Sequence, residues 1–396
     1  MSAFYEEVQT LRQEMIARRR DLHRHPELAF QETRTAGIVA AALSELGLEV
    51  RTGVGKTGVV ALLEGDREGP TLLIRADMDA LPIQEENETD YVSETPGVMH
   101  ACGHDAHTTI GLAVAKMLSQ RRAGIRGRVK FVFQPAEEIG EGARAMIEDG
   151  VLDAPRPDFS IGLHMWNELP VGRVAVTAGP CMAAADVWSC RITGYGGHGA
   201  QPDKTRDPIV AAAQVVSAVQ TIASRNVNPL DMAVVTVGAI HGGDAFNVIP
   251  PVVEMKGTIR TYRKDTQALV HRRLHDICEG VASALQCQAG VEIRTMTLAV
   301  DNDPEIADRI ARIAAGIVGE ENVLRNLRTM GSEDMSFLMD DIPGCYFFIG
   351  SANAERGLNY PHHNPRFDID EEAMFIGAAI LAEAAASFIL PSGEQG

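Results

Sequence analysis

The stretch Val129-Lys130-Phe131-Val132-Phe133-Gln134-Pro135-Ala136-Glu137-Glu138 joins an apolar, β-rich run to a proline and two adjacent glutamates. The run is typical of a buried strand, and the proline marks its end. Open α/β sheets bind ligands just beyond the carboxyl ends of their strands, which makes Glu137 and Glu138 candidates for chemistry. Two carboxylates near a divalent ion can divide the work of metal ligand and general base. A solvated pair of surface charges is the alternative.

Helical and strand patterns alternate on both sides of this stretch, up to about residue 200. We expect helices over 4–24, 31–47, 106–120 and 141–149, and strands over 57–63, 71–75, 129–133 and 159–163. Such alternation is the signature of a sheet flanked by helices. We therefore predict an α/β fold built on a mixed sheet.

The order of elements changes between residues 184 and 297. Strands are expected over 186–194, 232–240, 252–262 and 291–297, with helices over 207–225 and 266–286. This β-α-β-β-α-β order is that of a ferredoxin-like unit. A helix at 305–318, a strand at 345–349 and a helix at 371–389 then resume the first pattern. We predict a catalytic domain of residues 1–183 and 298–396 with an inserted domain of residues 184–297, whose two crossings could act as a hinge.

Polar side chains follow the other predicted core strands as well. Asp77 and Asp79 come after the strand at 71–75, His164 follows the strand at 159–163, and the segment Tyr360–Pro365 follows the strand at 345–349. The two aspartates could instead cap a turn, and His164 could be a hydrogen-bonded histidine near the core.

The densest group of metal-binding residue types lies in Met99–His107, which holds one cysteine, three histidines and one aspartate. Thiolate and imidazole are borderline-soft donors that suit zinc, cobalt, nickel or manganese. Gly103 lets the backbone turn so that Cys102 and His104 can face one point. A surface loop with a buried structural cysteine is the alternative.

Composition excludes several classes of protein. The 396 residues exceed one ordinary core and favour two domains. A net charge of −18, from 36 Lys and Arg against 54 Asp and Glu, opposes nucleic acid as a partner. We expect no membrane partner, since no apolar run reaches about 18 residues and Glu383 interrupts the Ala-rich tail. The six scattered cysteines and the absence of a signal peptide favour a reducing cytoplasm.

Eight short motifs occur in one order: LHRHPEL, LRADMDALP, MHACGHDAH, QPAEE, GLH, GGHGA, GSED and HNP. In this order the chain resembles the dinuclear amidohydrolases of the aminoacylase and carboxypeptidase superfamily, in the branch of hippurate hydrolases and auxin-conjugate hydrolases. The resemblance runs from about Leu22 to the carboxyl terminus. A dehydrogenase is excluded because no Gly-x-Gly-x-x-Gly run follows the first strand.

The resemblance implies two divalent ions per subunit, zinc or manganese, with cobalt or nickel as further candidates. It implies that Glu137 is the general base. The implied metal ligands are Cys102, His104, Glu138, His164 and one histidine of the HNP motif, where the spacing favours His363 and leaves His362 as the fallback. Asp79 and Asp105 are expected to orient the ligating imidazoles by hydrogen bonds.

For the inserted domain the resemblance implies a lid that also forms a homodimer or homotetramer. His198 matches a residue that stabilises the tetrahedral oxyanion, often in the partner subunit. Asn247 and Arg260 match positions that receive the substrate's α-carboxylate, and a guanidinium fork fits that group. An arginine on the sheet surface is the alternative for Arg260.

The expected activity is hydrolysis of N-acyl amino acids, of the N-acetyl or N-benzoyl type, to a carboxylic acid and a free amino acid. A dipeptidase or carboxypeptidase is the alternative within enzymes, and a catalytically silent binding protein the alternative outside them. Asp203 and Met335 depart from the residues more usual in the resembling family. Neither is an implied ligand or base, so they affect the expected substrate preference rather than the reaction.

Overall fold

The computed structural model describes residues 3–391, which form two compact units. Unit 1 comprises the chain up to Cys181, Asp301–Arg328 and the chain from Asp334 onward, and unit 2 comprises Met182–Val300 and Thr329–Glu333. The outer limits of the predicted catalytic domain, residues 1–2 and 392–396, lie outside the described residues.

The segment Thr329–Glu333 differs from our expectation, since the sequence placed it in the catalytic domain. Within unit 2, the Ala183 N–H donates to the Gly331 carbonyl at 2.9 Å, and the Tyr262 hydroxyl donates to the Thr329 carbonyl at 2.8 Å. Ala183 and Tyr262 are far from this segment in the sequence, so no local sequence pattern predicts these contacts.

Unit 1 is built on an eight-stranded mixed sheet with the order β1-β2-β4-β3-β5-β16-β6-β15. Its strands are β1 (Glu49–Val54), β2 (Gly58–Glu64), β3 (Arg67–Asp77), β4 (Arg126–Gln134), β5 (Phe159–Pro170), β6 (Val174–Ala175), β15 (Val323–Leu324) and β16 (Gly344–Ala352). Strand β3 runs parallel to β4 and β5, and β5 runs parallel to β16. The carboxyl ends of these four strands therefore meet at one edge of the sheet, as the α/β prediction required.

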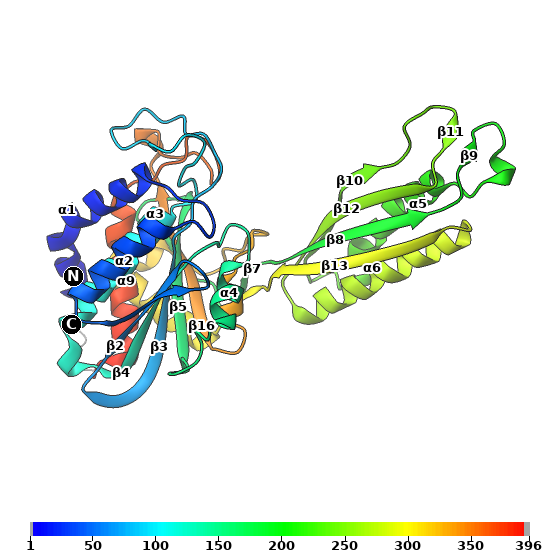
Figure 1. Cartoon of the computed structure of the whole chain (residues 1–396). Helices are drawn as coiled ribbons and strands as arrows, with labels where there is room; N and C mark the ends of the chain where they lie inside the picture. Colours follow the sequence, from blue (N-terminus) through cyan, green and yellow to red (C-terminus); the bar gives the residue numbers. More distant parts are fainter. Residues whose placement is uncertain (1–2, 392–396) are drawn as a thin grey trace. The chain divides into compact units, whose positions relative to one another are not determined.

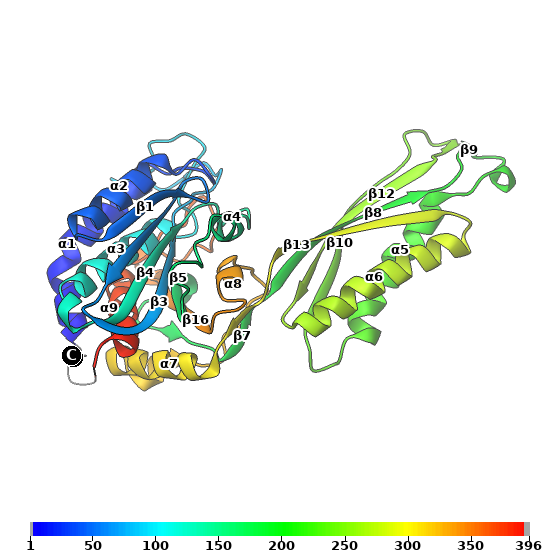
Figure 2. The ribbon, with the colours of Figure 1, turned by 60° about the horizontal axis from the view of Figure 1, so that its bottom comes forward.

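Helices cover both faces of this sheet. One face carries a layer made of α1 (Ala3–Arg24), α2 (Thr33–Glu45), α3 (His104–Ser119) and α9 (Glu372–Ile389), as Figure 1 shows. Helix α7 (Pro304–Val318) packs against α9 in the same layer (Figure 2). The shorter helices α4 (Gly142–Glu148) and α8 (Met335–Leu338) pack against each other, and α4 also contacts β4 (Figure 2). The apolar residues of the first layer and of the sheet form one continuous core.

Helix α9 lies at the centre of that layer and contacts α1, α3 and α7. By length and composition it could cross a membrane, with a mean hydropathy of 1.6 over 18 residues, so Glu383 does not interrupt the apolar run as we expected. In the structure 78% of this helix is buried within the protein. An apolar surface on all sides is what a helix surrounded by other core elements requires.

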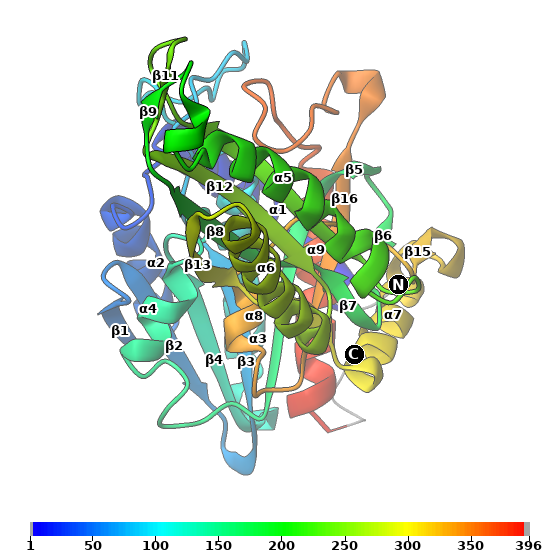
Figure 3. The same cartoon turned by 90° about the vertical axis from the view of Figure 1, so that its right-hand side faces the viewer.

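Unit 2 has a four-stranded antiparallel sheet with the order β10-β12-β8-β13 and two helices across one face (Figure 3). In chain order its elements are β8 (Ala184–Thr193), α5 (Pro208–Thr221), β10 (Ala233–His241), β12 (Val252–Thr261), α6 (Lys264–Ala284) and β13 (Gln288–Thr297). The ferredoxin-like prediction is confirmed.

Two further pairs of strands and five short helical turns complete the elements. The paired strands are β9 (Gly197–His198) with β11 (Val248–Ile249) and β7 (Gly179–Met182) with β14 (Val300–Asn302). The turns are η1 (Arg122–Gly124), η2 (Pro202–Lys204), η3 (Ile222–Asn226), η4 (Glu320–Asn322) and η5 (Ala354–Arg356).

The core of unit 2 depends on a close approach between Trp188 and Gly257. Trp188 is fully buried, and its indole N–H donates to the Thr236 carbonyl at 3.2 Å. A Cβ atom on Gly257 would lie 2.6 Å from the indole ring and would overlap the Thr236 carbonyl oxygen. Only glycine lets the three strands keep this spacing.

We expect Gly257→Ala to destabilise unit 2 by about 1 to 3 kcal/mol, because the added methyl group overpacks the core. The chain has two tryptophans, Trp166 in unit 1 and Trp188 in unit 2. Urea unfolding followed by fluorescence in a Trp166→Phe background therefore reports on unit 2. Gly290→Ala on β13 is the matched control, since its Cβ would have nothing within 4 Å. Equal urea midpoints for the two variants would contradict the prediction.

Candidate metal centre

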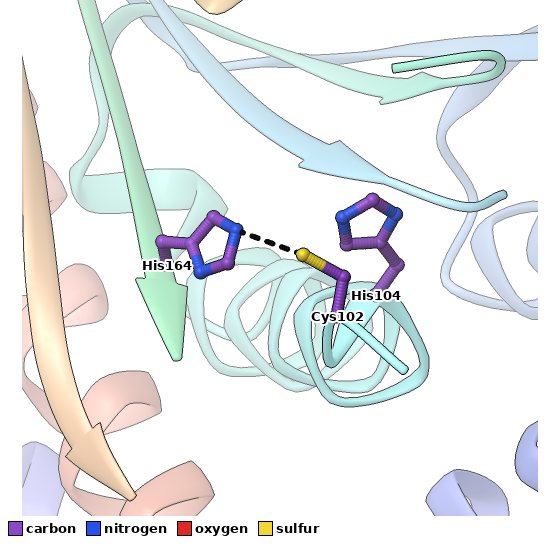
Figure 4. A group of neighbouring side chains, drawn as sticks. All are labelled: Cys102, His104 and His164. Atoms are coloured by element: carbon purple, nitrogen blue, oxygen red, sulfur yellow. Dashed lines mark hydrogen bonds between the residues drawn. The ribbon is translucent and has the colours of Figure 1, made fainter. Parts of the chain in front are cut away.

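Cys102, His104 and His164 come together at the carboxyl edge of the unit 1 sheet. Figure 4 shows the Cys102 sulfur lying between the two imidazole rings. The Sγ atom is 3.5 Å from His164 Nε2. Between Cys102 and His104, Gly103 has φ +91, and a Cβ there would lie 3.3 Å from the Met165 side chain. Glycine therefore permits the turn that brings both ligand atoms to one side.

His164 presents a lone pair to this group. Its Nδ1–H donates to the Met165 carbonyl at 2.6 Å, which leaves Nε2 unprotonated and facing Cys102. Burial, together with neighbouring His107, holds the pKa of His164 well below its usual range. A neutral imidazole with a free Nε2 is the form that binds a metal ion.

His104 also points one ring nitrogen into the centre. Its Nδ1–H donates to the Asp79 carbonyl at 2.9 Å, and its buried Nε2 has no hydrogen-bond partner among the described residues. This Nε2 lies 3.9 Å from Glu137 Oε2 and 3.9 Å from Glu138 Oε1. Burial lowers the pKa of His104, but the nearby carboxylates outweigh it, Asp77 most strongly, and raise it to about 10. The negative potential that favours a proton there also favours a cation.

Glu138 and His363 form the opposite side of the group. His363 Nε2 lies 3.3 Å from Glu138 Oε2, while the buried Oε1 of Glu138 has no hydrogen-bond partner among residues 3–391. His362 instead has its ring 5.0 Å from those of Trp166 and Phe367, and its Nε2 accepts the Asn167 N–H at 3.2 Å. The geometry therefore favours His363 over His362 as the histidine that would bind a metal ion.

Asp79 has the contacts expected of an orienting residue. Its two carboxylate oxygens accept the backbone N–H groups of Glu137 and Glu138, each at 3.0 Å. Its backbone carbonyl accepts the proton of His104. One residue thus aligns an imidazole and both glutamates.

Asp105 does not orient a ligating imidazole, which corrects our expectation. Its carboxylate accepts from Arg19 Nε at 2.9 Å, is 2.7 Å from His23 Nδ1, and caps the Ala106 N–H at 2.9 Å. Helix α3 begins at His104, so consecutive side chains are about 100° apart around its axis. His104 therefore faces the metal centre while Asp105 faces α1.

His107 and Asp77 belong to the centre's surroundings, although sequence reasoning gave His107 no role and left Asp77 with two alternatives. His107 Nδ1 donates to Asp77 Oδ1 at 2.6 Å, and its Nε2 accepts the Met165 N–H at 2.8 Å. The sequence signal that could have identified His107 was its spacing from His104, because residues three apart share a helix face. His107 follows His104 at that distance.

The three remaining predicted residues belong to unit 2. His198 and Asn247 are exposed and adjacent, since the Gly199 N–H donates to the Asn247 carbonyl at 2.8 Å. Arg260 lies on β12, partly buried, and its Nη1 has no hydrogen-bond partner among the described residues. Their roles toward a substrate stay predictions.

The donor atoms fit divalent metal ions. Three overlapping groups have ligand atoms that lie within 4.8 Å of one another: Cys102, His104 and His164; Cys102, Glu138 and His363; and His104, Glu137 and Glu138. Thiolate, imidazole and carboxylate together suit zinc and similar ions. The unpartnered nitrogen of His104 and oxygen of Glu138 are polar atoms that a cation would satisfy.

Comparison with known proteins agrees with this geometry. The model of peptidase family M20/M25/M40 matches residues 73–387. The chain is 40% identical over 372 residues to the N-acetylcysteine deacetylase of Bacillus subtilis (strain 168), covering 94% of this chain and 96% of the relative. It is 38% identical over 380 residues to the IAA-amino acid hydrolase ILR1-like 4 of Arabidopsis thaliana, covering 95% and 86%.

A solved structure is similar over nearly the same length. The Bacillus subtilis YXEP protein, described as a dinuclear metal binding peptidase from the M20 family, is 36% identical with a TM-score of 0.84. The similarity covers 96% of this chain and 98% of that chain. The two-unit fold and a dinuclear metal site therefore occur together in a relative.

We expect the His363→Ala variant to bind metal at least roughly tenfold more weakly, because it removes a nitrogen beside Glu138. His362→Gln should keep the metal content of the wild type, since an amide can still accept the Asn167 N–H. Metal content after dialysis against a weak chelator, measured by mass spectrometry, compares the two. The reverse pattern would make His362 the ligand.

His23 should make the stability of unit 1 depend on pH. Its two ring nitrogens lie 2.7 Å from Asp105 and 3.2 Å from Glu85. Burial and Arg19 lower its pKa, but these hydrogen bonds raise it to about 9. Because the pKa of His23 is higher in the folded protein than in the unfolded chain, protonated His23 stabilises the fold. This stabilisation is fully present below about pH 6.5 and is lost as the pH rises through 9.

The check is the urea midpoint of wild type and His23→Gln at pH 7 and pH 9.5. At pH 7 we expect the wild type to be more stable than His23→Gln by a few kcal/mol. At pH 9.5 this difference between the two proteins should be smaller. The partly exposed His25 provides a control, and His25→Gln should follow the wild type at both values. A difference for His23→Gln that is unchanged by pH would contradict the prediction.

Proposed function

Because the chain belongs to peptidase family M20/M25/M40, in which it is a metal-dependent amidohydrolase, we propose that it hydrolyses the amide bond of N-acyl amino acids. The products would be a carboxylic acid and a free amino acid. Support comes from relatives whose names specify such amides, N-acetylcysteine and conjugates of IAA with amino acids.

The observation that carries the proposal is the placement of Glu137 beside the candidate ligands. Its Oε2 is 3.9 Å from His104 Nε2, and its side chain is 10% exposed whereas His104 is fully buried. The next residue, Glu138, has its side chain beside His104 and His363. One carboxylate can therefore bind a cation while its neighbour remains available to move a proton.

The residues of the centre divide the reaction among them. When bound, divalent ions would polarise the amide carbonyl and lower the pKa of a water molecule. Cys102, His104, Glu138, His164 and His363 would hold these ions. Glu137 would accept the proton of the attacking water and pass it to the leaving amine. Asp79 keeps the two glutamates in place through their backbone N–H groups.

The three predicted residues of unit 2 complete the proposal. Arg260 and Asn247 would bind the α-carboxylate of the substrate, and His198 would stabilise the tetrahedral oxyanion. The unpartnered Nη1 of Arg260 leaves a guanidinium donor available within unit 2 for a carboxylate. We keep zinc or manganese as the proposed ions, with cobalt and nickel as candidates, because the donor set accepts all four.

We expect Glu137→Gln to keep the wild-type metal content and to lose turnover by about 10²- to 10⁴-fold, because glutamine cannot accept the proton. Metal analysis and assays with N-acetyl and N-benzoyl amino acids measure both quantities. Glu148→Gln on the exposed side of α4 is the control and should behave as the wild type. Retained turnover in Glu137→Gln would overturn the role of Glu137.

The same assays separate the proposed function from a dipeptidase or carboxypeptidase. Both activities use one metal centre and one carboxylate clamp, so they differ only in the acyl side of the substrate. We expect kcat/KM for N-acyl amino acids to exceed that for dipeptides with the same carboxyl-terminal residue. A preference for dipeptides would favour the alternative.

A further inference from the structure

Arg75 is a buried cation that donates hydrogen bonds to Asp77, Gln134, Asp334 and Tyr346. On β3, its side chain is 1% exposed. Its Nη1 donates to Asp77 Oδ2 at 2.6 Å, its Nη2 to Asp334 Oδ1 at 3.1 Å, and its Nε to Gln134 Oε1 at 3.0 Å. Asp77 and Asp334 are themselves fully buried. A buried charge is tolerated only when it is paired and hydrogen-bonded, and Arg75 meets both conditions.

The contact with Asp77 leads to the metal ligand His164. The other oxygen of Asp77 accepts from His107, and His107 accepts the Met165 N–H. Met165 directly follows His164, and its carbonyl accepts the His164 proton. The series Arg75, Asp77, His107, Met165 therefore determines where the Nε2 atom of His164 lies.

This series gives Asp77 and His107 a supporting role beside the proposed metal ligands. Asp77, His104 and His107 have donor atoms close enough to hold an ion. However, the Asp77 oxygens accept from His107 and Arg75, and the ring nitrogens of His107 are used by Asp77 and Met165. We therefore assign Asp77 and His107 the role of holding the ligands in place by hydrogen bonds.

The contact with Asp334 leads to the two glutamates. The Gln134 amide donates to Asp334 Oδ1 at 2.6 Å, and the Ala143 N–H donates to Asp334 Oδ2 at 2.9 Å. Gln134 ends β4, and Ala143 lies in the first turn of α4. The loop between them carries Glu137 and Glu138, so both ends of this loop bind one carboxylate, whose charge Arg75 balances.

We propose that Arg75 is a positioning residue for the whole metal centre, placing His164 through Asp77 and the glutamate loop through Asp334. It acts through Asp77 and Asp334, whose hydrogen bonds support His164 and the loop that carries the two glutamates. The planar guanidinium reaches acceptors on several elements in different directions, which a lysine ammonium on a flexible stem cannot reproduce. The proposal deepens the function proposed above, on which it rests for the identity of the ligands.

The test is a cobalt titration of protein stripped of metal by a chelator. Co²⁺ bound to the Cys102 thiolate gives a charge-transfer absorption that reports on ligand geometry without turnover. We expect Arg75→Lys to lower Co²⁺ affinity by about 10- to 100-fold, the usual cost of losing an orienting group, and to alter the spectrum. Arg75→Met should lose more. Arg128→Lys is the matched control, because Arg128 on β4 pairs with Glu64 at 2.8 Å in an exposed position.

Two conservative variants test the two routes separately. Asp77→Asn should lower Co²⁺ affinity, because it weakens the support of His164. Asp334→Asn should lower kcat at saturating metal more than it lowers affinity, because it frees the loop that carries Glu137. If Arg75→Met does not fold, Arg75→Lys and these two variants still decide the matter.

The outcomes distinguish this proposal from the function it rests on. A Co²⁺ affinity and spectrum in Arg75→Lys equal to those of the wild type would overturn the positioning role, as would an equal loss in Arg128→Lys. A wild type that binds Co²⁺ but cleaves no N-acyl amino acid would overturn the proposed function alone. Its spectrum would still show whether Arg75 positions the ligands.

Discussion

Negative charge buried at one edge of the sheet is the constraint on which the rest of unit 1 depends. Burial lowers the pKa of His104, but Asp77, Asp79 and Glu138 outweigh it and raise that pKa. Burial, with Glu138 and Glu137, raises the pKa of the Cys102 thiol. Carboxylates gathered in this way repel one another unless positive charge lies between them. Cations at the ligand atoms would supply it on one side, and Arg75 supplies it on the other.

Much of the fold and of the site follows from local patterns. The apolar run at 129–133 and its polar end identify a strand and the residues just beyond it, and the same rule finds His164. Gly103 between Cys102 and His104 predicts a tight turn, which the structure shows. The order of six elements predicts the ferredoxin-like unit. The hydrophobic period distinguishes strands from helices along the sequence, and no tertiary contact is needed to recognise it.

The remaining features depend on contacts that sequence patterns do not encode. Arg75 and Asp334 are 259 positions apart, and Arg19 and Asp368 are 349 apart. Asp105 was wrongly expected to orient a ligating imidazole. It directly follows the predicted ligand His104 on a helix, and a helix turns successive side chains to different sides. Whether His362 or His363 faces Glu138 depends on the backbone of the loop, where His363 has φ 64.

The assignment of Thr329–Glu333 to unit 2 affects how the two units could be separated. The backbone passes between the units at four places, after Cys181, Val300, Arg328 and Glu333. Replacing residues 182–300 with a short linker would leave Thr329 without its bridge partner Met182 and Gly331 without its donor Ala183. Unit 2 therefore cannot be removed by one deletion. A minimal unit 1 would also need residues 329–333 to be deleted and Arg328 to be joined to Asp334 by a new linker.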